Sequence, residues 1–193
     1  MNLIPTIMEE ERGGVKVYYD LFSRLLKDRI VFVGGPIEDA MANIVIAELI
    51  YLEKQNPKKD IQMYILSPGG AISAGLAIYD TMQYIKPDIV TIGIGRVASF
   101  ASILLAAGTK GKRFLLPNAD VMIHQPWISG IQSVTVTDLK ITTEFLERTK
   151  KRIIKILAKH TGQSEATIAR DVERDFWMDA KEAKKYGIVD KIL

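Results

Sequence analysis

The chain has 193 residues, 48% hydrophobic and 25% charged, a composition typical of one globular domain with a substantial core. It has no cysteine and only two histidines, which excludes disulfides, thiol catalysis and cysteine-ligated metals and argues against a multi-histidine metal site. The net charge is +3 and no basic run is interleaved with aromatic residues, so we expect no nucleic-acid binding. The sequence shows no apolar run of 18 residues and no leader-like N-terminus, so we expect no membrane span and a cytoplasmic location.

Short apolar runs alternate with stretches of helical periodicity from about Arg29 onward. They predict strand, helix, strand, helix, strand and helix at residues 30–33, 37–54, 61–66, 71–85, 89–94 and 99–107. Strands that alternate with helices indicate right-handed βαβ crossovers and a mostly parallel sheet. Two further short strands are predicted at residues 113–116 and 121–124. The chain is therefore expected to form a single α/β domain.

The C-terminal third has a different pattern and is predicted to be helical. One long helix is expected over residues 138–160. Ser164 and Asp179 are suited to cap two shorter helices, and Gly187 to end the second. The long helix carries several lysines and arginines opposite an apolar stripe. We interpret the basic residues as a solvated face and the stripe as a surface for contact between subunits.

Ser99 lies where a predicted strand ends and a helix begins, after the run Gly93-Ile-Gly-Arg-Val-Ala. This placement puts its hydroxyl at the carboxyl edge of the sheet, where ligand sites of α/β proteins form. Backbone N–H groups at the helix start point toward the same place, as a nucleophile that generates an oxyanion requires. A simple N-cap serine explains the local pattern equally well. Val97 and Ala101 occupy the glycine positions of the G-x-S-x-G signature of α/β-hydrolases, so that signature is absent.

A second strand-to-helix junction carries the sequence Ser67-Pro-Gly-Gly70. Paired glycines allow close approach of the backbone to a ligand and leave N–H groups pointing outward. A tight turn alone would also explain them. Because the two junctions end neighbouring strands, we expect them to share one site.

A serine nucleophile needs a base and an acid that orients it. His124 ends an apolar strand. His160 lies in the last turn of the long helix, where a favourable interaction with the helix dipole explains it. We therefore choose His124 as the base. Asp171 and Asp175 are both candidates for the acid, and local reasoning does not separate them. The chain order Ser, His, Asp differs from those of chymotrypsin, subtilisin and the α/β-hydrolases.

With these residues in place, the chain resembles the ClpP family, the proteolytic subunits of the Clp protease. The resemblance covers almost the whole length, and its specificity comes from several motifs in the right order. They are Tyr19-Asp-Leu-Phe-Ser-Arg-Leu-Leu-Lys-Asp-Arg, Ser67-Pro-Gly-Gly, Ile78-Tyr-Asp-Thr-Met-Gln, Ala98-Ser99, Ala107-Gly-Thr-Lys-Gly-Lys-Arg, Met122-Ile-His124-Gln-Pro, Thr161-Gly-Gln-Ser and Glu173-Arg-Asp175.

The resemblance implies a role for each matching position. It makes Ser99 the nucleophile, His124 the base and Asp175 the acid, since the family uses the aspartate of the Glu-Arg-Asp motif. It implies that the backbone N–H groups of Gly70 and Phe100 bind the oxyanion, although relatives usually carry methionine at position 100. It also implies an apolar pocket that receives a loop of an ATPase, formed by Tyr64, Tyr84, Ile92, Phe114 and Leu116.

The resemblance also implies an architecture, a crotonase-like α/β fold with a protruding helical handle. Its parts would be an N-terminal axial segment (about 1–18), the head (about 19–122), the handle (about 123–160) and a C-terminal helical part of the head (about 161–193). Two stacked rings of seven identical or mixed subunits would enclose the sites. An AAA+ ATPase of the ClpX, ClpA or ClpC type would deliver unfolded protein. Neither a cofactor nor a metal is implied, since ATP binds to the partner.

The segment Trp127-Ile-Ser-Gly-Ile-Gln-Ser-Val-Thr-Val-Thr137 departs from the family pattern, because relatives tend to carry a shorter, glycine-rich stretch that forms the handle strand. In the docking pocket, Gln62 replaces an expected aromatic residue. Two alternatives to an active peptidase follow. One is a weakly active or structural ring subunit that needs an active paralogue, and the other is an acyl-CoA hydratase or isomerase on the same fold.

Overall fold

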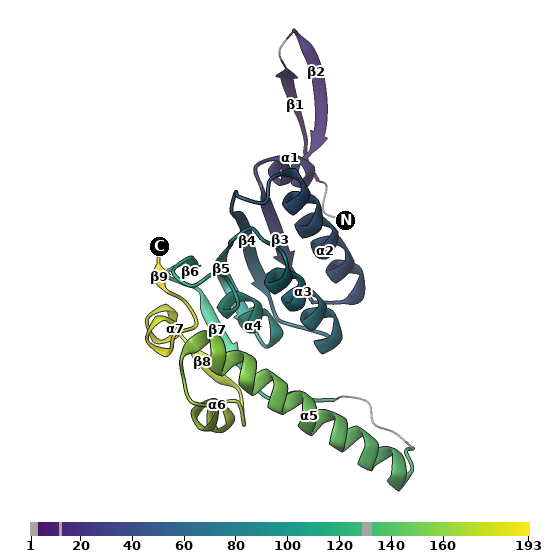
Figure 1. Ribbon diagram of the computed structural model, residues 1–193, viewed down its shortest axis with the longest axis vertical. Helices are drawn as coiled ribbons and strands as arrows, with labels where there is room; N and C mark the ends of the chain where they lie inside the picture. Colours follow the sequence, from purple (N-terminus) through teal and green to yellow (C-terminus); the bar gives the residue numbers. More distant parts are fainter. Residues whose placement is uncertain (1–3, 12, 129–132) are drawn as a thin grey trace.

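Parallel strands form the centre of the fold (Figure 1). The computed structural model describes residues 4–11, 13–128 and 133–193, and within these ranges seven strands join in one sheet. The α/β class and the mostly parallel sheet predicted from the sequence are confirmed. The first three strands of the sheet lie side by side in the order β3 (Ile30–Gly34), β4 (Ile61–Ser67) and β5 (Ile89–Ala98), with β3 at the edge.

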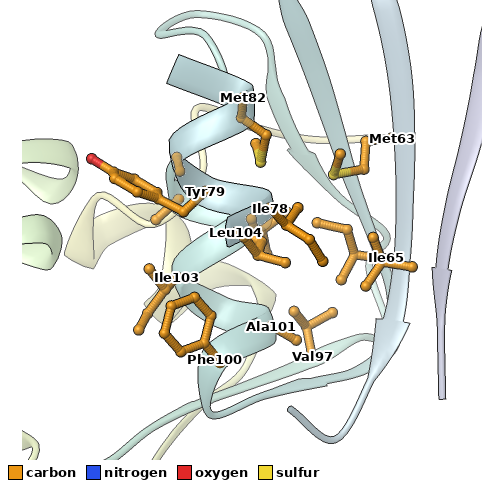
Figure 2. Close-up of a cluster of buried hydrophobic side chains, with 14 of the residues drawn as sticks. Met63, Ile65, Ile78, Tyr79, Met82, Val97, Phe100, Ala101, Ile103 and Leu104 are labelled. Atoms are coloured by element: carbon orange, nitrogen blue, oxygen red, sulfur yellow. The ribbon is translucent and has the colours of Figure 1, made fainter. Parts of the chain in front are cut away.

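A helix follows each of these three strands, as the apolar periodicity of the sequence predicts. The helices are α2 (Asp39–Gln55), α3 (Ile72–Tyr84) and α4 (Phe100–Ala106). Alternate residues of β4, among them Met63 and Ile65, are fully buried in this helix-covered core (Figure 2). All seven residues of α4 are buried. Ser99, which directly precedes α4, is therefore held by a helix that lies inside the core.

The long strand β5 carries two shorter parallel neighbours along its length. Its first half pairs with β6 (Arg113–Leu115) and its second half with β7 (Asp120–Ile123). Two C-terminal strands complete the sheet, β8 (Phe176–Met178), antiparallel to β7, and β9 (Lys191–Ile192), parallel to β6. The predicted all-helical C-terminal part is therefore wrong. Strands of two or three residues are too short to show an alternating pattern, and neighbouring strands decide their conformation.

The N-terminal part forms a hairpin that extends away from the sheet (Figure 1). Strands β1 (Thr6–Glu11) and β2 (Val15–Asp20) pair antiparallel, and α1 (Leu21–Lys27) follows with Asp20 as its N-cap. These elements were not predicted.

Three helices make up most of the C-terminal region: α5 (Val136–Thr161), α6 (Glu165–Asp171) and α7 (Ala180–Tyr186). The predicted caps are confirmed, because Ser164 and Asp179 accept N-cap hydrogen bonds and Gly187 ends α7 in a left-handed conformation.

The second half of α5 is packed against the core, where Thr149, Ile153 and Leu157 are buried. The first half projects from the molecule (Figure 1), and its apolar side chains Val136, Leu139, Ile141 and Phe145 are exposed. The basic residues Lys151, Arg152 and Lys155 are exposed, as predicted for a solvated face.

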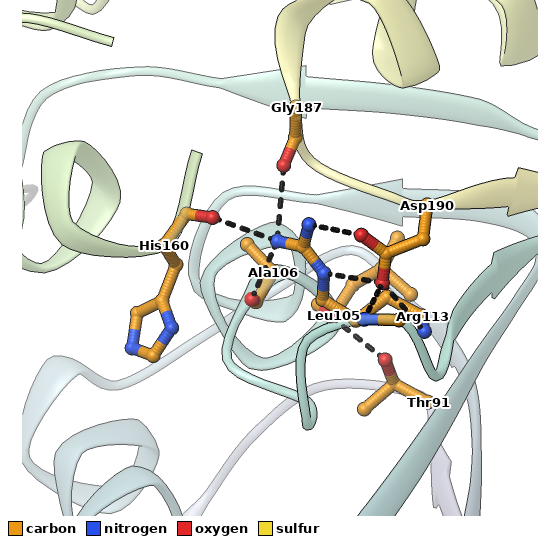
Figure 3. A network of polar contacts seen from close by, with 8 residues as sticks. Thr91, Leu105, Ala106, Arg113, His160, Gly187 and Asp190 are labelled. Atoms are coloured by element: carbon orange, nitrogen blue, oxygen red, sulfur yellow. Dashed lines mark hydrogen bonds and ion pairs between the residues drawn. The ribbon is translucent and has the colours of Figure 1, made fainter. Parts of the chain in front are cut away.

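A buried guanidinium ties these helices to the sheet (Figure 3). Arg113 on β6 donates to both carboxylate oxygens of Asp190 and, through Nη1, to the carbonyl oxygens of Ala106, His160 and Gly187. These carbonyls lie at the C-terminal ends of α4, α5 and α7. One side chain therefore fixes the ends of three helices against one strand.

Candidate active site

Ser99 has an unusual backbone conformation between β5 and α4. Its φ of 56° and ψ of −127° lie outside the regions that a serine ordinarily adopts. Its side chain makes no N-cap hydrogen bond, so the simple N-cap interpretation is wrong. A strained strand-to-helix turn of this kind presents the hydroxyl at the top of the sheet, as in a nucleophile elbow, even though the G-x-S-x-G sequence is absent.

Ser99, His124 and Asp175 form one chain of contacts. The Ser99 Oγ lies 2.8 Å from His124 Nε2, and His124 Nδ1 lies 3.1 Å from the Asp175 Oδ1. The side chain of His124 is 16% exposed and that of Asp175 61% exposed. These are the distances and the order of a nucleophile, a base and an orienting acid.

The structure separates the two candidate acids. The Asp171 carboxylate accepts a hydrogen bond from the Tyr186 hydroxyl at 2.9 Å and pairs with Arg170. Asp171 therefore contributes to the packing of α6 against α7, whereas Asp175 contacts His124.

His124 follows β7 directly, and its position depends on that strand. The Ser99 N–H donates to the Met122 carbonyl oxygen at 2.8 Å, so the pairing of β5 with β7 holds the serine and the imidazole at the same edge of the sheet. On the other side of the strand, β8 carries residue 176 opposite Ile123. This pairing brings Asp175 to the imidazole.

The two strand-to-helix junctions meet at this edge. Gly69 has a φ of 90°, and a Cβ there would lie 2.5 Å from the Ser99 Cβ and 3.0 Å from the Phe100 nitrogen, so only glycine fits. Ile37 exchanges hydrogen bonds with the Gly69 carbonyl and the Ala71 N–H, on either side of Gly70. In this pairing pattern the Gly70 N–H points away from Ile37. Phe100 is the first residue of α4, so its N–H has no acceptor within the helix.

A groove of about 980 Å³ opens beside Ser99. The first turns of α3 and α4, the segment after His124 and the middle of α5 form its walls. Most of the lining is apolar, including Ile72, Leu76, Trp127 and Phe145. Such a surface suits an extended polypeptide with apolar side chains.

Three of the five residues predicted for a docking pocket share a row across the sheet. Tyr64, Ile92 and Phe114 lie in register on β4, β5 and β6, and Phe32 on β3 extends the row. They face away from the helix-covered core, and the rings of Phe32 and Tyr64 stack with centroids 5.6 Å apart. We refer to these four residues as the sheet row.

The other two predicted docking residues lie apart from the sheet row. Leu116 follows β6 and is half-buried against the core. Tyr84 ends α3 and is 83% exposed. Gln62 accepts a hydrogen bond from the Tyr64 hydroxyl at 3.4 Å, so the polar replacement is partnered.

His160 does not have the role predicted for it. Burial, with smaller contributions from Lys159 and Arg113, lowers the pKa of the His160 imidazole to about 4. The ring is neutral at pH 7 and cannot act as a cation at the end of the helix. It lies instead against Tyr79, whose hydroxyl is 3.0 Å from His160 Nε2.

Several residues around the site were missed from the sequence. Ser102, fully buried on α4, donates its hydroxyl to the Ser99 carbonyl oxygen at 2.6 Å and supports the unusual turn. Gly75 on α3 leaves room for the Phe100 ring, which a Cβ would strike. A small residue one helical turn after a predicted strand-to-helix junction is the signal that would have indicated Gly75.

The part of the chain that the structure describes contains neither a metal cluster nor a membrane-spanning helix. Among the described residues no group of three His, Asp or Glu side chains is arranged to hold a metal ion. Of the helices in residues 4–11, 13–128 and 133–193, none has the length and apolarity needed to cross a bilayer.

The predicted handle strand falls partly outside the described residues. Residues 129–132 are not described, and the flanking residues 124–128 and 133–135 form neither helix nor strand. The expectation for the central part of this segment therefore stays a prediction.

The family model described as Clp protease matches residues 12–193, essentially the whole chain.

Proposed function

The chain belongs to the Clp protease family, and we propose that it is an active serine endopeptidase in which Ser99, His124 and Asp175 form the catalytic triad. The observation that carries the proposal is the chain of contacts from the Ser99 Oγ through both imidazole nitrogens to the Asp175 carboxylate. The fold agrees with this family, because a mostly parallel sheet with helices is the ClpP architecture.

The proposed reaction is acyl transfer to Ser99. His124 Nε2 accepts the hydroxyl proton as the Ser99 Oγ attacks the peptide carbonyl, and Asp175 stabilises the imidazolium through Nδ1. The backbone N–H groups of Gly70 and Phe100 donate to the oxyanion of the tetrahedral intermediate. The imidazolium then returns the proton to the leaving amine. Water, activated by the same imidazole, hydrolyses the acyl-enzyme and regenerates the serine.

We further propose the assembly and partners of the family for this chain. Two stacked rings of seven subunits would cover the apolar residues that are exposed on the first half of α5, namely Val136, Leu139, Ile141 and Phe145. An AAA+ ATPase of the ClpX, ClpA or ClpC type would thread unfolded protein into the chamber, and ATP would bind to that partner. A cytoplasmic location remains the expectation from the sequence.

A weakly active ring subunit that needs a paralogue is the alternative. The observation that favours it is the exposure of Asp175, 61% in the single chain, because a carboxylate in water orients an imidazole poorly. The acyl-CoA hydratase alternative is not supported, since the match to the Clp protease family covers residues 12–193.

The test is hydrolysis of a fluorogenic peptide by the assembled protein and by Ser99→Ala. We expect the variant to lose at least about 10³-fold in kcat, because the covalent step disappears, with an unchanged particle mass. Ser102→Ala is the control. It removes the buried hydrogen bond that supports the Ser99 turn, worth about 1 kcal/mol of stability, but leaves the Ser99 hydroxyl in place, so we expect a far smaller loss of kcat than in Ser99→Ala. Full activity of Ser99→Ala would refute the proposal, and a wild-type chain that cleaves only after a paralogue is added would favour the alternative.

A further inference from the structure

Three segments that are distant in the sequence meet beside the candidate active site. The Lys150 Nζ on α5 donates to Gln125 Oε1 at 2.8 Å and to Glu173 Oε2 at 2.7 Å. The Gln125 Nε2 donates to the Glu173 carbonyl oxygen at 3.0 Å. The Gln125 backbone N–H donates to the Val172 carbonyl oxygen at 2.6 Å. We refer to Lys150, Gln125 and Glu173, with these bonds, as the lysine clamp.

Each arm of the clamp ends next to a member of the proposed triad. Gln125 is bonded directly to His124 in the chain, and Glu173 lies two residues before Asp175. The His124 to Asp175 contact therefore depends on how these two segments are held relative to each other. The Asp175 side chain is 61% exposed, so packing of the carboxylate itself contributes little to this geometry.

Lys150 is suited to hold both segments. Its side chain is 29% exposed, its helix is anchored in the core by the neighbouring Thr149 and Ile153, and its ammonium contacts an oxygen from each segment. The hydrogen bond from Lys150 lowers the pKa of the Glu173 carboxyl, so this partner is ionised at neutral pH. A cation between a carboxylate and an amide oxygen satisfies two acceptors at once.

We propose that Lys150 is a positioning residue, which sets the distance between His124 and Asp175 by holding Gln125 and Glu173 together. This inference rests on the proposed function. It connects the helix that projects from the molecule to the hydrogen bonds of the triad. Movement of α5 would reach the imidazole through the clamp.

The relative sizes of the effects on stability and on reaction rate distinguish a positioning role from a merely structural one. An ion pair as exposed as that of Lys150 with Glu173 contributes little to stability. A displacement of about 1 Å in a catalytic arrangement, in contrast, can cost ~100-fold in rate. Loss of the clamp should therefore reduce turnover far more than it reduces stability.

The experiment compares Lys150→Met with Lys150→Arg and with the control Lys151→Met, all as assembled particles. Methionine keeps the apolar stem but has no donor. Arginine keeps donors for both oxygens. Lys151 is the neighbouring exposed lysine on the same helix. For Lys150→Met we expect kcat on a short peptide to fall on the order of 10-fold, with KM within about 2-fold, because substrate contacts stay. Arginine should restore most of kcat, and Lys151→Met should match the wild type.

A second readout needs no activity. Hydrogen exchange followed by mass spectrometry should show faster exchange in Lys150→Met for peptides that cover residues 123–128 and 172–176, and unchanged exchange elsewhere. Unchanged exchange there, or a kcat within 2-fold of the wild type, would overturn the positioning role while leaving the peptidase intact. If the wild type shows no Ser99-dependent cleavage but the exchange still rises, the proposed function fails and the clamp stands as a local ordering device.

Discussion

At the scale of single residues, the backbone of Ser99 is the feature that turns a common residue into a candidate nucleophile. A hydroxyl that caps a helix is engaged in a hydrogen bond with a backbone N–H group of that helix. The Ser99 hydroxyl instead lies 2.8 Å from an imidazole nitrogen. The strain of this turn is supported by the Ser102 hydroxyl and by the close approach of Gly69. Strain held in place by neighbouring contacts is characteristic of functional sites.

The two histidines are predicted to behave differently in catalysis. His124→Ala should reduce kcat about as much as Ser99→Ala, because the members of a triad act as a unit, and the double variant should be little worse than either single one. His160→Gln should keep turnover near the wild-type value, since this ring contacts Tyr79. Peptide hydrolysis at saturating substrate measures these effects. Additive losses in the double variant would contradict cooperation between Ser99 and His124.

The lowered pKa of the His160 imidazole predicts that the stability of the protein depends on pH. Its pKa is about 4 in the folded chain, against 6.5 for an unperturbed histidine. Between these values the unfolded chain binds a proton that the folded chain does not, so stability falls as the pH drops from about 6.5 to 4. His160→Gln should flatten this part of the profile, because its side chain does not titrate. Thermal unfolding at pH 7 and pH 5 compares the two proteins, and equal slopes would exclude the effect.

At the scale of elements, the parts that could be predicted are those with a long or repeated pattern. The alternation of apolar strands with amphipathic helices predicted the elements from β3 through α4 and the parallel sheet. The N-terminal hairpin and the strands β8 and β9 were missed. The hairpin strands are mostly exposed and have no buried face, and strands of two or three residues are too short to show a pattern. Tertiary pairing decides these elements.

The candidate site likewise contains residues that local sequence pattern predicts and residues that it does not. Ser99, His124 and the paired glycines stand out because each lies where a strand ends, a position that local pattern reveals. Local pattern does not separate Asp171 from Asp175, because one ends α6 and the other follows it by only four residues. The family motif favoured Asp175, and in the structure it is the Asp175 carboxylate that contacts His124. The lysine clamp joins residues 25 and 23 positions apart on elements whose relative placement no local pattern contains.

The sheet row gives a prediction for the docking of a partner. Tyr64 on β4 and Phe114 on β6 lie in register on either side of Ile92 on β5, outside the helix-covered core. If this row receives a loop of an ATPase, Tyr64→Ser and Phe114→Ser should abolish ATP-driven degradation of a folded substrate but spare cleavage of short peptides. Leu116 lies apart from the sheet row and is half-buried against the core, so Leu116→Ser is the packing control and should reduce both activities alike. Parallel assays of both activities measure this, and equal loss in Tyr64→Ser or Phe114→Ser would place the row in the structural core.

At the scale of the whole molecule, the single chain presents surfaces that a larger assembly would cover. The first half of α5 projects with an apolar side, and the N-terminal hairpin extends from the opposite end (Figure 1). The groove beside Ser99 has α5 as one wall. An assembly through α5 would therefore act directly on the site, both through the groove and through the lysine clamp.

The central claim is that Ser99 is an activated nucleophile, and covalent labelling tests it most directly. The assembled protein is treated with a fluorophosphonate probe, digested and mapped by mass spectrometry. We predict one probe adduct per subunit on Ser99, and a rate of labelling that falls on the order of 10³-fold in His124→Ala, because the hydroxyl then has no base. Absence of labelling in the assembled protein, or an adduct on a serine other than Ser99, would contradict the account.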